Sequence, residues 1–160
     1  MRSRSVIATL ALVVVATDAS ACLTELLGTW RGPGTVLGRS IVMEQRWQRS
    51  VMGAFVELQM RHFASDTSAR ASFEGRGFYR PTGANAPDSV GGTWLDARGL
   101  TMGIAGACLD GTFSSHWTGR TERGRTIYSL REGALEVIDS VFPANGAARE
   151  FGRSRLTRQP

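Results

Sequence analysis

The feature that most restricts the fold of this chain is an alternation of residue character with a period of two. Residues 40–50 place one set of mainly apolar side chains on a single face, namely Ile41, Met43, Gln45 and Trp47. Residues 54–63 repeat the pattern, and residues 50–53 between them have the composition of a turn. A period of two belongs to β-strands, whereas amphipathic helices repeat every 3.6 residues. These residues are therefore predicted to form a β-hairpin, although the period alone does not say which face is inside.

Seven further segments of similar length follow, separated by turn sequences such as Asp110-Gly111 and Glu132-Gly133. They are residues 73–80, 90–97, 100–104, 112–118, 126–131, 135–142 and 150–157. Short strands at this spacing are typical of a sandwich or a barrel, and closure into a barrel removes exposed sheet edges. Glycine supplies 19 of the 160 residues, often at strand centres, where barrels bend sharply. We predict an all-β chain, a single antiparallel up-and-down barrel of about 9–10 strands over residues 22–160, preceded by a short helix at 23–27.

The first 21 residues have the organisation of a signal peptide. Arg2 and Arg4 precede an eleven-residue apolar run from Val6 to Ala16, and small residues lead up to Ala21. A run of this length is too short to span a bilayer. We therefore predict that residues 1–21 are removed and that the protein is exported, either to the periplasm or out of the cell.

The two cysteines leave two alternatives open. Cleavage after Ala21 makes Cys22 the first mature residue, and small residues before a cysteine are typical of lipoprotein signals. A lipid on Cys22 would attach the protein to a membrane, and membrane association is expected only in that case. In the other alternative Cys22 pairs with Cys108, because disulfides persist in exported proteins.

The composition argues against several classes of function. All 19 basic residues are arginine and the formal net charge is +5, but the arginines are scattered without a stacking platform of aromatic residues, so no nucleic-acid partner is expected. The histidines, His62 and His116, and the two cysteines lack a zinc-binding spacing, so no metal is expected. Ser115 and His116 are adjacent on a predicted strand and point to opposite faces, which excludes direct contact as a nucleophile and its base.

Three short motifs resemble those of a known group of barrels. They are Leu27–Gly34 (LGTWRGPG), Phe73–Tyr79 (FEGRGFY) and Gly92–Asp96 (GTWLD), the last followed by an Arg98-Gly99 turn. In this order they resemble a bacterial family of exported, lipocalin-like (calycin-type) β-barrels of unknown function with GTWxG, FEGRG and GTWxD strands, and the opening motif is distantly similar to that of nitrobindin. The resemblance covers residues 26–158 and implies the fold but no activity.

In calycins the tryptophan of the first strand closes one end of the barrel beneath an arginine of the last strand. The resemblance therefore implies a structural role for Trp30, covered by Arg153 or Arg155 through a cation–π contact. Two ligand sites of similar barrels do not transfer. Nitrobindins hold haem through a histidine near the last strands, and residues 126–160 contain none. Fatty-acid-binding proteins use an Arg-x-Tyr pair on the closing strand, which here lacks tyrosine. No cofactor is expected.

The aromatic residues predict where a ligand would bind. Those expected to line a cavity are Trp47, Phe55, Tyr79, Trp94, Trp117 and Tyr128, with Glu44, Arg46 and His116 as polar companions. The sequence leaves open whether these rings fill the core instead.

We predict a barrel that binds a small hydrophobic or amphipathic molecule without catalysis. One alternative is an isomerase, cyclase or lyase with an interior acid–base pair drawn from Glu57, His62 and His116. A second is a structural or assembly lipoprotein of the cell envelope. The oligomeric state, monomer or dimer, is left open.

Overall fold

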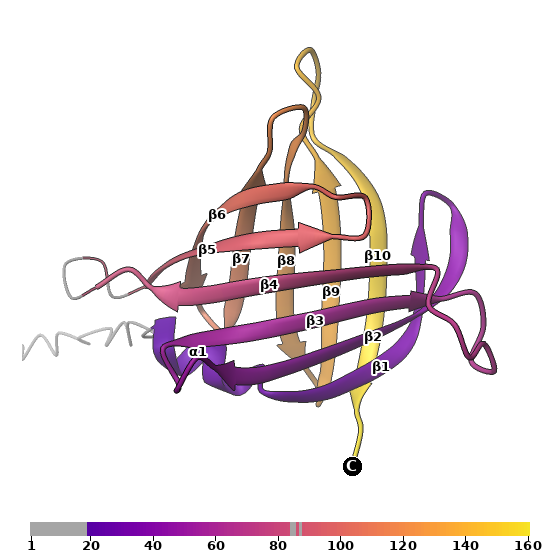
Figure 1. The fold of residues 1–160 in the computed structure, drawn as a ribbon, viewed down its shortest axis with the longest axis horizontal. Coiled ribbons are helices and arrows are strands. Elements are labelled where there is room, and N and C mark those ends of the chain that lie inside the picture. The colour runs from indigo at the N-terminus through magenta and orange to yellow at the C-terminus, as the bar shows by residue number, and fades with distance from the viewer. Residues whose placement is uncertain (1–18, 84–85, 87) are drawn as a thin grey trace, which may run out of the picture.

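The protein is described by a computed structural model that covers residues 19–83, 86 and 88–160. Within these residues one short helix precedes ten antiparallel strands, and each strand pairs with its neighbour in sequence until β10 closes the barrel against β1 (Figure 1). The elements are α1 (Ala19–Glu25), β1 (Gly28–Val36), β2 (Arg39–Ser50), β3 (Phe55–Phe63), β4 (Phe73–Pro81), β5 (Ser89–Asp96), β6 (Thr101–Leu109), β7 (Thr112–Thr118), β8 (Arg123–Arg131), β9 (Ala134–Val141) and β10 (Arg149–Arg158). The predicted up-and-down barrel is confirmed.

Alternation along the strands separates the core from the outer surface. On β2, Met43 and Trp47 are buried inside the barrel while Arg46 is exposed on its outer face. On β3, Val56 and Leu58 continue the same buried layer. The more apolar face of each strand points inward because burial removes its surface from water, at about 25 cal/mol per Å².

Two-residue turns set the register of several hairpins. Leu37-Gly38, Asp110-Gly111 and Glu132-Gly133 all have positive φ at both positions, for example 49° at Asp110 and 70° at Gly111. This is the backbone of a type I′ turn, whose twist matches that of the strands on either side. The turns predicted around 110–111 and 132–133 are therefore found.

The structure differs from the sequence prediction at the start of the fold and on β6. Helix α1 begins at Ala19 and ends at Glu25, earlier than the predicted 23–27. Strand β6 runs to Leu109 rather than to residue 104. Residues 105–108 were not predicted as strand because they are small and do not alternate between polar and apolar. Gly106 shows why a small residue is needed there: a Cβ on it would lie 2.6 Å from the Ser114 carbonyl oxygen.

Helix α1, at the lower left of Figure 1, lies at one end of the barrel and contacts β4, β6 and β7. Leu23 and Leu26 are buried, and the Trp30 indole nitrogen donates a hydrogen bond to the Leu26 carbonyl oxygen at 2.8 Å. Trp30 thus has the predicted structural position. Among the described residues, no helix is long and apolar enough to cross a membrane.

The arginine that covers Trp30 is Arg158, whose guanidinium carbon lies 4.2 Å from the ring centroid. The expectation of Arg153 or Arg155 is wrong because both residues belong to the outer face of β10. Arg153 pairs there with Glu150 at 2.8 Å, and Arg155 pairs with Glu136 at 2.6 Å. Arg158 lies directly opposite Trp30 in the β1–β10 ladder.

Cys22 and Cys108 form a disulfide that ties α1 to β6. Of the two alternatives for Cys22, the structure contains the disulfide. Residues 1–18 of the predicted signal peptide lie outside the described residues, and residues 19–21 form the first turn of α1.

Candidate functional site

The barrel contains a cavity of about 430 Å³. It lies toward the end opposite α1, and residues of the turns that join β1 to β2, β5 to β6 and β7 to β8 border its mouth, toward the top and right of Figure 1. The size falls within the range of small-molecule sites, roughly 300–1,000 Å³. This barrel is therefore hollow at one end and filled at the other.

Two tryptophans lie against the wall of the cavity because glycines face them on the next strand. A Cβ on Gly75 of β4 would come 2.2 Å from the six-membered ring of Trp94 on β5. A Cβ on Gly124 of β8 would likewise come 2.2 Å from the ring of Trp117 on β7. Each ring occupies the space that the side chain of any residue other than glycine would fill at position 75 or 124. The two glycines therefore keep the tryptophans out of the centre of the barrel and leave the cavity open.

Aromatic residues form the floor of the cavity. Tyr79 and Tyr128 line it directly. Beneath them, Trp47 stacks on Tyr79 with ring centroids 5.5 Å apart and meets Tyr128 edge-on at 5.1 Å. Phe113 completes the layer, 5.6 Å from Tyr128. Burial raises the pKa of both tyrosines above the ordinary value, so their hydroxyls stay protonated and can donate hydrogen bonds.

Asp139 of β9 places a carboxylate on this cavity. Its Oδ1 accepts a hydrogen bond of 2.6 Å from the Thr126 hydroxyl, and only 9% of the residue is exposed. Burial raises the pKa of Asp139 to about 6, because taking the charge out of water disfavours the ionised form. The carboxylate is therefore mainly ionised at neutral pH, and its Oδ2 makes no hydrogen bond within the described part of the chain.

His62 of β3 is the imidazole that lines the cavity. It stacks on Phe73 with ring centroids 5.0 Å apart, and burial lowers its pKa to about 4, so the ring is neutral at pH 7. Its Nε2 is buried without a hydrogen-bond partner among residues 19–83, 86 and 88–160. In those same residues, no three His, Cys, Asp or Glu side chains form a group that could hold a metal ion.

An ion-pair network lies at the mouth. Arg98 pairs with Asp96 at 2.7 Å and with Glu122 at 2.8 Å, which connects the turn after β5 to the turn after β7. The Trp94 indole nitrogen donates to Asp96 at 3.3 Å. Burial alone would raise the pKa of Asp96, but hydrogen bonds from Arg98 and Trp94 outweigh it and hold that pKa below the ordinary value. The Asp96 carboxylate therefore stays ionised at neutral pH.

The structure brings together four of the aromatic residues predicted to bind a ligand. Tyr79, Trp94, Trp117 and Tyr128 all line the cavity. Trp47 lies in the layer below them, and Phe55 packs under Arg80, whose guanidinium carbon is 5.7 Å from the ring centroid. The binding roles of these residues stay predictions, but the cavity shows that the rings do not fill the whole core.

The predicted polar companions Glu44, Arg46 and His116 lie on the outer face of the barrel and not in the cavity. They occupy the positions that alternate with buried residues such as Gln45 and Ser115, so their side chains point away from the interior.

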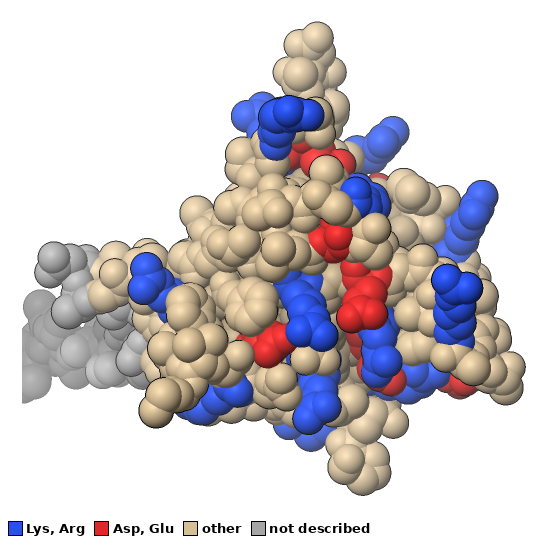
Figure 2. Space-filling model, viewed as in Figure 1, with Lys and Arg blue, Asp and Glu red and all other residues tan. Residues whose placement is uncertain are grey.

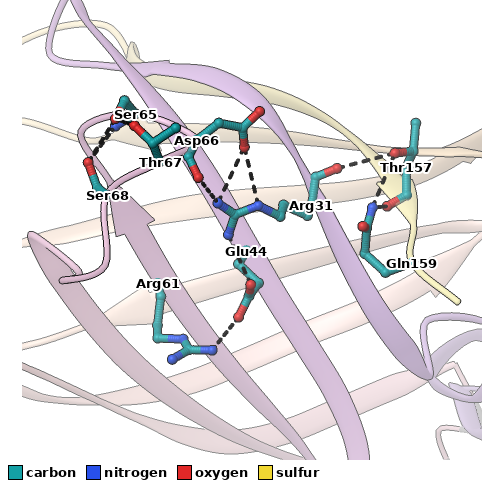
Figure 3. Close-up of polar contacts among 9 residues, drawn as sticks. All are labelled: Arg31, Glu44, Arg61, Ser65, Asp66, Thr67, Ser68, Thr157 and Gln159. Carbon is teal, nitrogen blue, oxygen red and sulfur yellow. Dashed lines mark hydrogen bonds and ion pairs between the residues drawn. The ribbon is translucent and has the colours of Figure 1, made fainter.

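Figure 3 shows Glu44 in its actual surroundings, paired with Arg61 and with Arg31, the latter at 3.0 Å. Arg31 also reaches Asp66 of the β3–β4 loop at 3.3 Å. Acidic and basic side chains lie side by side on the face of the molecule in Figure 2, as such pairing requires. The environment of Glu44 is thus that of a surface ion pair.

The three residues considered for acid–base chemistry do not lie together in the structure. His62 lines the cavity, whereas His116 and Glu57 lie on outward-facing positions, where His116 is exposed and Glu57 is buried. Burial alone would raise the pKa of Glu57, but hydrogen bonds from Gln48 and Gln59 outweigh it and lower that pKa.

Sequence reasoning missed Asp139, the most deeply placed carboxylate of the site. A signal for it exists, because Leu135, Val137 and Val141 share its face of β9, and a carboxylate at an apolar-face position is exceptional. Thr126, which also lines the cavity, was missed as well.

The fold and the cavity define the class of this protein: a closed, ten-stranded antiparallel barrel, counted over the described residues, with an internal cavity at one end. The crystal structure of Rv2717c from M. tuberculosis has the same fold, with a TM-score of 0.71 at 15% sequence identity over 90% of this chain and 99% of that chain. No protein-family model and no curated protein matches the sequence. The resemblance to the lipocalin-like family therefore stays a prediction from its motifs.

Proposed function

We propose that the protein binds a small, mainly apolar molecule in the barrel cavity. The observation that carries this proposal is the way the hollow is maintained, with Trp94 and Trp117 laid against glycines of neighbouring strands. A barrel of this kind would gain stability if larger side chains filled the space. A hollow lined by aromatic rings with a few polar groups is the usual form of a small-molecule site.

A neutral hydrophobic dye tests the proposal. N-phenylnaphthylamine emits more strongly in apolar surroundings, and we expect one molecule to bind per barrel. Gly75→Ala pushes the Trp94 ring toward the cavity and takes space from the dye, which should weaken binding about fivefold or more, equivalent to about 1 kcal/mol. Gly103→Ala is the matched control, because a Cβ on Gly103 has no atom nearer than 4.0 Å.

Three results would contradict the proposal: no saturable dye binding, equal affinities of Gly75→Ala and the wild type, or equal weakening by both substitutions. Thermal unfolding of each variant separates loss of binding from loss of fold. A native mass spectrum of freshly purified protein then shows whether a small molecule is retained.

We further propose that the protein is exported and that residues 1–21 are removed. Support comes from the signal-peptide pattern and from the disulfide, which persists in oxidising compartments. The mass of the mature protein tests this: we expect an N-terminus at Cys22 without lipid. A diacylglyceryl group on Cys22 would favour the envelope lipoprotein instead.

A barrel enzyme is the second candidate, and the observation that favours it is the presence of both Asp139 and His62 on the cavity. A buried carboxylate with a pKa of about 6 can accept and return a proton near neutral pH. Chemical conversion of a bound molecule by the wild type, lost in Asp139→Asn, would establish this alternative over simple binding.

A further inference from the structure

The charges around the cavity differ between its mouth and its interior. At the mouth, Asp96 and Glu122 share Arg98, and Arg149 adds an exposed positive charge, so the acidic and basic groups are equal in number. Farther in, His62 is neutral at pH 7. Among the described residues that line the interior, this leaves Asp139 as the charged side chain. The interior of the cavity is therefore negative, although the net charge of the whole chain is positive.

The charge of Asp139 has no counter-ion in the described part of the protein. Thr126 satisfies Oδ1, while no arginine or histidine pairs with the carboxylate there. Buried carboxylates are normally paired with a cation, because an unpaired buried charge is costly. An unpaired carboxylate on the wall of a cavity therefore points to a cation that is supplied from outside.

The rings around the cavity suit the same kind of ligand. The rings of Trp94 and Trp117 lie over Gly75 and Gly124 and line the cavity, so a bound ligand contacts them. Aromatic faces attract cations, most strongly when both partners are shielded from water. An anion would meet repulsion from the carboxylate.

We propose that the natural ligand is an apolar amine, bound as an ammonium ion that donates a hydrogen bond to Asp139 Oδ2 while its hydrocarbon part contacts Trp94 and Trp117. This inference rests on the function proposed above and specifies the chemical class of the ligand. The cavity of about 430 Å³ is within the range of small-molecule sites and is large enough for such an amine.

Three probes that share one hydrocarbon chain test the inference: octylamine, octanol and octanoate. Each is titrated by calorimetry at about pH 8, where Asp139 is ionised. We expect octylamine to bind the wild type about tenfold or more tightly than octanol, because hydrogen bonds to charged groups contribute about 1.5–3 kcal/mol. Octanoate should bind most weakly. Octanol is the more hydrophobic of the first two, so hydrophobicity cannot produce this order.

Two isosteric substitutions on β9 separate the role of Asp139 from a change in net charge. Asp139→Asn should bind octylamine and octanol equally, with octanol affinity as in the wild type. Glu136→Gln removes one negative charge from the outer face of the same strand and should keep the preference for the amine.

The possible results separate the two proposals. Equal affinity of the wild type for octylamine and octanol, tightest binding of octanoate, or a preference for the amine that survives in Asp139→Asn would each overturn the amine inference alone. Absence of binding by all three probes would overturn the proposed binding function itself. If Asp139→Asn does not fold, the order of the three probes on the wild type decides the question.

Discussion

At position 139 one carboxylate interrupts the apolar face of β9, and its burial links the stability of the protein to pH. The pKa is raised from 3.8 to about 6 on folding. A carboxyl group with a raised pKa contributes stability that is fully present below about pH 4 and is lost as the pH rises through about 6. The pKa difference corresponds to at most about 3 kcal/mol.

We expect Asp139→Asn to gain stability relative to the wild type as the pH rises from about 4 to about 8, by up to about 3 kcal/mol. The amide can still accept the hydrogen bond from Thr126. Urea unfolding at both pH values measures the difference. A pH-independent effect of Asp139→Asn would refute the assignment.

His62 shows the opposite dependence. Its pKa is lowered from 6.5 to about 4 by burial, so its contribution to stability is present above about pH 6.5 and is lost as the pH falls toward 4. The sequence pattern indicated His62 as a possible member of an interior acid–base pair, but it did not indicate Asp139. Residue type alone draws attention to imidazoles, whereas Asp139 is exceptional only through the face it occupies.

Among the elements, strand β10 shows which side-chain positions the period of two can predict and which it cannot. Arg153 and Arg155 face outward, while Arg158 lies over Trp30 at the end of the barrel and donates hydrogen bonds to the carbonyl oxygens of Leu27 and Glu25. The sequence identified the tryptophan and the strand correctly. It did not identify the arginine, because that choice depends on the register between β1 and β10, which are far apart in the chain.

We expect Arg158→Ala to lower the free energy of unfolding by about 1–3 kcal/mol, since it removes the cation–π contact and two hydrogen bonds to the end of α1. Arg153→Ala, on the outer face of the same strand, should change it by about 0.5 kcal/mol or less. Denaturant unfolding of both variants gives the comparison. Equal effects would show that the cover of Trp30 does not stabilise the barrel.

For the whole molecule, the barrel itself was predictable from strand spacing and turn chemistry, but its hollow was not. The space left beside Trp94 depends on Gly75, which precedes it by nineteen positions in the sequence and faces its ring across the β4–β5 ladder. Such a pair is visible only when the register of neighbouring strands is known. The sequence therefore predicted the aromatic residues of the site without showing whether they surround a space or fill it.

The disulfide between Cys22 and Cys108 lies at the filled end of the barrel and stabilises the fold there. We expect its removal in a Cys22→Ser/Cys108→Ser variant to cost about 3–5 kcal/mol, because the bond closes a long loop. Thermal unfolding with and without a reductant measures this, and the double variant should be insensitive to the reductant. N-phenylnaphthylamine binding well below the unfolding temperature should persist, since the cavity opens at the opposite end. Loss of dye binding by a folded double variant would contradict this separation.

The closed base and open mouth of this barrel also determine how a bound molecule exchanges. With Trp30, α1 and the disulfide at the base, the interior is a blind tube, and a second molecule cannot displace the first from behind. Water expelled during binding must leave through the opening by which the ligand arrives. The residence time of a ligand would then depend on the bridge that Arg98 makes between two turns at that opening.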